Sequence, residues 1–147
     1  MTDLPDFELH RFTPYRLAVA AQKTSEGLAR LYRARFGLSI PEWRVLAHLA
    51  HAGDVSVRDI EARVVMEKSK VSRAASRLEA AGYIKKSASA ADRRLVSMSL
   101  TPKGKELMAE LLPLAEAYQK ELEGRLGDAL DGFEAGVDRL LNDIPPS

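Results

Sequence analysis

The 147-residue chain contains no cysteine. Disulfide bonds, thiol-based redox sensing and thiolate metal sites are therefore excluded, and a cytoplasmic location is expected. No stretch approaches the roughly 20 apolar residues that a membrane-spanning helix needs. The N-terminal segment MTDLPDFELHRF carries early acids and lacks the apolar centre of a signal peptide. We therefore expect no membrane partner.

Motifs typical of enzymes are missing as well. The sequence has no glycine-rich phosphate loop, no helical histidine pair with an acid between, and no nucleophile elbow. Its only histidines are His10, His48 and His51, and although the last two would share a helix face, no third metal ligand accompanies them. We expect neither an enzyme nor a metal site nor a cofactor.

Charge is distributed unevenly along a chain whose net charge is only +1. Residues 56–105 hold twelve Lys or Arg against five Asp or Glu, whereas residues 106–147 hold three against ten. The first of these segments would attract phosphate groups and the second would repel them.

The basic segment contains an amphipathic helical pattern, in residues 66–84, whose two faces differ in chemistry. At about 100° per residue, apolar side chains gather on one face, namely Val71, Ala74, Ala75, Leu78 and Ala81. The opposite face and its flank carry hydroxyls and cations but no acid, namely Ser69, Lys70, Ser72, Arg73, Ser76 and Arg77. Such side chains meet base edges and phosphates in a DNA major groove. A DNA-reading helix is therefore favoured; a solvated helix that lacks acids by chance is the alternative.

A β-hairpin is predicted directly after this helix. Gly82 lies where a helix-ending residue with positive φ is expected, and residues 83–86 then favour a short strand. Residues 95–100 alternate with a period of two, which is typical of a half-buried strand. The connection between the strands ends in a basic tip formed by Asp92, Arg93 and Arg94. A helix, a hairpin with a basic tip and a further helix form the layout of a winged helix, whose wing can place an arginine in the minor groove.

Helices are expected in most of the remaining chain. Their start signals are Thr13-Pro14, Ser56 with Asp59, and Thr101-Pro102, and their end signals include Gly37 and Gly53. Both terminal segments carry apolar stripes broader than one small winged domain can cover, so an obligate dimer is expected. The residues expected in or against its interface are Leu130, Phe133, Val137 and Leu141.

From Gly37 to Leu107 the sequence resembles the MarR (multiple antibiotic resistance regulator) family of winged helix-turn-helix transcription factors. The resemblance rests on the segments PEWRVLAHLA, KSKVSRAASRLEAAGYI and DRRLVSMSLTPKGKEL, in matching order and spacing. It implies a mainly α fold with a small β-hairpin, forming one domain over residues 1–147. A winged helix-turn-helix lobe at 38–100 would lie between dimerisation helices at 13–36 and 102–144. It also implies Arg94 as the minor-groove probe, with Asp92 helping to orient it.

The expected function is that of a sequence-specific, dimeric regulator that binds a near-palindromic site in double-stranded DNA, most simply as a repressor. The resemblance implies that a small anionic, often aromatic, effector relieves this binding. Cations and aromatics near the first two helices satisfy that chemistry, namely His10, Tyr15, Arg16, Trp43 and Arg44. The alternative, which we favour from the sequence, is that Tyr15 and Trp43 belong to the core and that Arg16 and Arg44 are exposed or ion-paired. The alternative function is a winged-helix module that binds protein and has no sequence-specific DNA binding.

Overall fold

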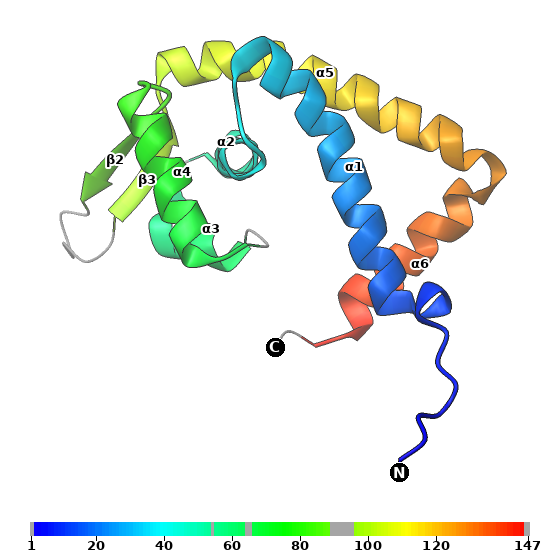
Figure 1. Cartoon of the computed structure of the whole chain (residues 1–147). Helices are drawn as coiled ribbons and strands as arrows, with labels where there is room; N and C mark the ends of the chain where they lie inside the picture. The colour runs from blue at the N-terminus through cyan, green and yellow to red at the C-terminus, as the bar shows by residue number, and fades with distance from the viewer. Residues whose placement is uncertain (1, 54, 64–65, 89–95, 146–147) are drawn as a thin grey trace. The chain divides into compact units, whose positions relative to one another are not determined.

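The computed structural model describes residues 2–53, 55–63, 66–88 and 96–145. The chain forms two compact units, Met1–Glu110 and Leu111–Ser147. The elements that begin in the first unit are η1 (Leu9–Arg11), α1 (Thr13–Phe36), α2 (Ile40–Ala52), β1 (Val55–Ser56), α3 (Val57–Arg63), α4 (Lys68–Ala80), β2 (Ile84–Ala88), β3 (Val96–Leu100) and α5 (Pro102–Leu126) (Figure 1). The second unit contains most of α5 together with η2 (Gly127–Ala129) and α6 (Leu130–Asp143). Among the described residues, no helix has the length and apolar character required to cross a membrane.

The predicted hairpin is confirmed as the antiparallel pair β2 and β3. Ile84 pairs with Leu100 and Ala88 with Val96, so the strands stay in register along their whole length. A third strand, β1, pairs antiparallel with the other edge of β3, and the strand order is β1-β3-β2. This two-residue strand was not predicted, because two residues are too short to show a periodic pattern.

The core of the first unit lies under α4. Val71, Ala74, Ala75 and Leu78 are all buried, and α4 packs against α2, α3 and β2. The predicted apolar face is therefore confirmed at these four positions. The expectation for Ala81 was wrong: this residue is exposed, because it is the C-cap residue and lies one position beyond the end of α4.

Side-chain caps begin three of the helices; those at Ser56 and Thr101 were predicted from the sequence, and that at Ser39 was not. The hydroxyl of Ser39 accepts a hydrogen bond from the N–H of Glu42 at 3.3 Å, at the start of α2. The hydroxyl of Ser56 accepts one from the N–H of Asp59 at 3.0 Å, and the hydroxyl of Thr101 accepts one from the N–H of Gly104 at 3.0 Å. At α1 the expected cap was wrong by one position. Phe12 is the N-cap residue, and Thr13 and Pro14 lie inside the first turn, where proline is tolerated because those N–H groups have no partner in the helix.

The C-terminus of α4 is joined tightly to the start of α5. Gly82 has φ +84°, and the N–H of Tyr83 donates to the carbonyl of Leu78 at 2.9 Å, which completes a Schellman motif. The ammonium of Lys103 donates to the carbonyl of Ala81 at 2.8 Å. Gly104 lies so close to Tyr83 that a Cβ on this glycine would be 2.0 Å from the Tyr83 carbonyl oxygen. These contacts hold the first turn of α5 against the end of α4 and the start of the hairpin.

We expect Gly104→Ala to destabilise the protein by about 1–3 kcal/mol, because the added methyl group overlaps the Tyr83 carbonyl oxygen, which is held by a hydrogen bond from the N–H of Thr101. Chemical denaturation followed by circular dichroism measures the change. The matched control is Gly124→Ala in the same helix, where a Cβ meets nothing within 4 Å. This control should gain about 0.5–1 kcal/mol from helix propensity. If the two variants were equally stable, the packing of Gly104 against the Tyr83 carbonyl would not limit the side chain at position 104.

Candidate DNA-binding surface

The exposed face of α4 carries all six side chains that the sequence singled out. Ser69, Lys70, Ser72, Arg73, Ser76 and Arg77 are each exposed, whereas the opposite face of the helix is buried. We call these six residues the α4 surface. Within α4 the sequence has a single acid, Glu79, which is not among them. The α4 surface is therefore a solvent-facing stripe of hydroxyl and cationic groups, which is the chemistry that phosphates and base edges accept.

The side of α4 opposite the α4 surface packs closely against neighbouring elements through small side chains. Ala74 and Ala75 are buried where α4 meets its neighbours, and such short side chains let two helices approach closely. A rigid helix presents its polar groups with less conformational freedom than a loop would.

Arg77, one member of the α4 surface, has a partner on α2. Its Nε lies 3.4 Å from Oε1 of Glu42. The hydroxyl of Ser39 donates a hydrogen bond to the same carboxylate oxygen at 2.8 Å. This ion pair joins two residues far apart in the sequence, and no local pattern signals it.

The hairpin that follows α4 is described up to its tip. Asp92, Arg93 and Arg94 lie outside the described residues, so their expected role in a minor groove stays a prediction. The strands that carry the tip are paired with each other as far as Ala88 and Val96. Lys85, on β2, is exposed and adds a further cation close in sequence to α4.

The five residues expected to bind an effector fall into three separate environments. Trp43 stacks on the buried Tyr32, with ring centroids 5.5 Å apart and an interplanar angle of 23°. Burial raises the pKa of Tyr32 to about 12, against the opposing effect of Arg33 and Arg44. Trp43 is thus part of the packing between α1 and α2.

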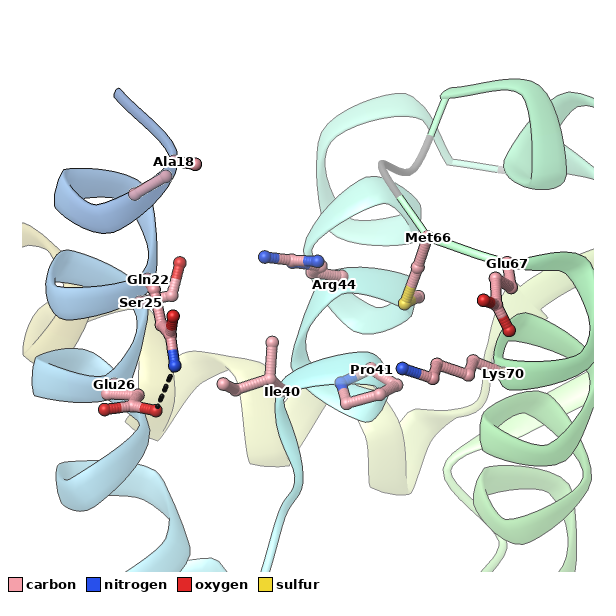
Figure 2. Close-up of a pocket in the computed structure, with 11 residues that line it drawn as sticks. Ala18, Gln22, Ser25, Glu26, Ile40, Pro41, Arg44, Met66, Glu67 and Lys70 are labelled. Atoms are coloured by element: carbon pink, nitrogen blue, oxygen red, sulfur yellow. Dashed lines mark hydrogen bonds between the residues drawn. The ribbon is translucent and has the colours of Figure 1, made fainter. Parts of the chain in front are cut away.

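Arg44 lines a cavity of about 520 Å³ between α1, α2 and the start of α4 (Figure 2). The wall from α1 is formed by Ala18, Ala21, Gln22, Ser25 and Glu26. The opposite wall is formed by α2, by the two residues that precede α4 and by the first turn of α4, namely Ile40, Pro41, Arg44, Met66, Glu67 and Lys70. The cavity therefore combines an apolar lining with two cations and two acids.

His10, Tyr15 and Arg16 line a different cavity of about 300 Å³ along the beginning of α1, together with Val19, Ala20 and Lys23. The rings of His10 and Tyr15 lie edge to face, with centroids 5.8 Å apart. This cavity shares no lining residue with the one at Arg44. The structure thus does not bring the five residues into one pocket.

The apolar residues expected at a dimer interface lie on α6 in the second unit. Within the described residues, α6 buries none of its side chains. Phe133 is 49% exposed and Leu141 is 72% exposed, while Leu130 and Val137 are half-buried. So much exposed apolar surface on one helix is typical of an interaction site.

Among the described residues, no group of three or more His, Cys, Asp or Glu side chains is placed to hold a metal ion. His48 and His51 lie on α2, where the first is half-buried and the second exposed.

Comparisons with known proteins agree on one family. The model of the MarR family matches residues 36–95. The MarR family transcriptional regulator SPO1453 from Silicibacter pomeroyi DSS-3 is 30% identical, and its crystal structure matches with a TM-score of 0.80 over 94% of this chain and 98% of that one. BpsR of Bordetella bronchiseptica, whose DNA binding is regulated by 6-hydroxynicotinic acid, is 24% identical with a TM-score of 0.80 over 96% and 100% of the two chains.

Among curated proteins, the HTH-type transcriptional regulator TtmR from Methylorubrum extorquens (strain PA1) is 28% identical over 130 residues, which is 86% of this chain. The chain spans 65% of the length of TtmR, and likewise 65% of a second curated relative, YdgJ of Bacillus subtilis.

Proposed function

Because the chain belongs to the MarR family of winged-helix transcriptional regulators, which are not enzymes, we propose that it binds double-stranded DNA as a homodimer and acts as a repressor. The observation that carries this proposal is the α4 surface, with its exposed serines and cations opposite a buried apolar face. A B-DNA major groove, about 12 Å wide, admits an α-helix with such side chains. Arg73 and the serines would contact base edges, and Lys70 and Arg77 would contact phosphates.

The hairpin supplies the second contact of this proposal. Arg94 would enter the minor groove, where the negative potential attracts arginine, while Asp92 would orient it and Arg93 would contact a phosphate. The pairing of β2 with β3 supports this role, since the two strands that flank residues 92–94 in the sequence form an antiparallel hairpin directly after α4.

Dimerisation would bring two copies of the α4 surface to one duplex. The exposed apolar side chains of α6 support this step, because a second copy would remove them from water. Two recognition helices related by a two-fold axis would then bind half-sites about 10 base pairs apart in a near-palindrome.

An anionic, aromatic effector would bind in the cavity at Arg44. Its size lies in the range of ordinary ligand pockets, about 300–1,000 Å³, and Arg44 would offer the carboxylate a charged donor. The side chain of Arg44 extends toward α1 in Figure 2. Because the start of α4 forms part of the wall, a bound ligand would alter the position of the recognition helix and so relieve DNA binding.

The α4 surface is tested by Arg73→Ala. We expect a loss of about 1–3 kcal/mol in binding to sites selected from a random pool of duplexes, with relaxed preference at one base position. Arg94→Ala should instead weaken binding to all sequences and lower the salt slope by about one unit. Fluorescence anisotropy at several salt concentrations measures both effects.

The control for these variants is Lys120→Ala, which removes the same charge from an exposed position in the acidic part of α5. Its DNA affinity should equal that of the wild type. If Arg73→Ala and Arg94→Ala also bind like the wild type, the assignment of the DNA-binding surface is wrong. If wild-type binding stays weak and featureless as salt is lowered, the chain is a protein-interaction module instead.

Dimerisation is tested by Leu141→Asp. A charge at this position should shift the sedimentation coefficient from that of a dimer toward that of a monomer, because an unpaired carboxylate cannot be buried between two copies without a large penalty. Asn142→Asp adds the same charge at the next exposed position and should stay dimeric. A folded wild-type monomer at micromolar concentration would refute the proposed dimer.

The effector site is tested with 6-hydroxynicotinic acid and benzoate as probes, followed by calorimetry. Arg44→Ala should weaken binding of the active probe at least tenfold, and Arg16→Ala, in the separate cavity, should leave it unchanged. The active probe should lower DNA affinity by the factor by which DNA lowers probe affinity. If Arg16→Ala weakens probe binding and Arg44→Ala does not, the effector binds in the cavity at Tyr15 instead. If no aromatic acid binds the wild type, the proposed effector site is wrong.

A further inference from the structure

We propose that Glu42 is a positioning residue for DNA binding, whose carboxylate holds Arg77 in the orientation in which the guanidinium meets a DNA phosphate. This inference rests on the proposed function and adds to it a residue of α2 that does not itself touch DNA.

In this ion pair the side chain of Glu42 is largely buried, whereas that of Arg77 is more than half exposed to solvent. The Nε of Arg77 lies 3.4 Å from Oε1 of Glu42, and the side chain of Glu42 is 14% exposed while that of Arg77 is 54% exposed. A guanidinium has five N–H donors in a planar fork, and the observed contact involves its Nε edge. The remaining donors can therefore serve a second acceptor while the pair with Glu42 stays intact.

Glu42 is itself held in place by the first turn of α2. Its backbone N–H donates to the hydroxyl of Ser39 at 3.3 Å, and that hydroxyl donates back to Oε1 at 2.8 Å. Ser39 is the N-cap residue of α2, so the carboxylate is fixed to the helix start. Because α2 packs directly against α4, the carboxylate has a defined position beneath Arg77.

The fold gains little from this ion pair, since one partner is more than half exposed and water screens the attraction. Its effect on binding is larger. An arginine that is already oriented loses less conformational freedom when a phosphate fixes it, and such preorganisation raises affinity.

Electrostatic repulsion between Glu42 and DNA predicts the opposite effect on affinity, so the two explanations can be distinguished. A carboxylate next to a DNA-binding surface repels phosphate, so on charge alone removing it should strengthen DNA binding. Positioning of Arg77 predicts the opposite sign. The two accounts are therefore separated by the direction of a single measured change.

The test uses the full chain and a mixed-sequence DNA duplex of about 30 base pairs, because phosphate contacts dominate binding to such a probe. Glu42→Gln should bind it about three- to tenfold more weakly, with a salt slope lower by about one unit, as should Arg77→Ala. Glu42→Asp keeps the charge but withdraws the carboxylate by one methylene, and it should weaken binding as well. Arg77→Lys should resemble Arg77→Ala, because one ammonium lacks the fork that reaches both partners.

The double variant Glu42→Gln with Arg77→Ala separates positioning from damage to the fold. If Glu42 acts through Arg77, the double variant should bind no more weakly than Arg77→Ala alone. Equal losses in both backgrounds would overturn the proposal, and so would tighter binding by Glu42→Gln or unchanged binding by Glu42→Asp. Failure of the wild type to bind the duplex in low salt would refute the proposed function itself.

Discussion

The burial of one face of α4 is the constraint on which the rest of the first unit depends. Val71, Ala74, Ala75 and Leu78 pack into the core, and α4 contacts α2, α3 and β2 through this face. Because side chains on a helix point in fixed directions, burying these four residues forces the serines and cations between them outward. The hydrophobic effect therefore orients the polar surface, although the polar residues contribute little to stability.

Contacts at the end of α4 fix the start of the hairpin and the first turn of α5. Gly82 reverses the chain in a conformation that only glycine adopts readily, and the next residues enter β2. The close approach of Gly104 to Tyr83 then fixes where α5 begins. The position of the hairpin after α4 thus depends on one short, hydrogen-bonded junction.

Prediction from the sequence succeeded where the signal is local. The two faces of α4, the positive φ of Gly82 and the caps at Ser56 and Thr101 follow from residues within a few positions of each other. It failed for β1, which is too short to show a pattern. For Trp43 the sequence left a core position and a ligand site open, with the core favoured, and the stacking of Trp43 on the buried Tyr32 agrees with the core position. Composition does not tell which helix covers an aromatic ring.

The sequence by itself thus determined which residues form helices, which face of α4 is buried and where cations meet no acid, since these depend on periodicity and on caps that span one turn. Only the tertiary structure decided that Glu42 pairs with Arg77, and that Arg44 and Arg16 line separate cavities. Those relations depend on the distance and angle at which packed helices meet. Side-chain volumes across the whole interface set that distance and angle, and no local pattern in the chain records them.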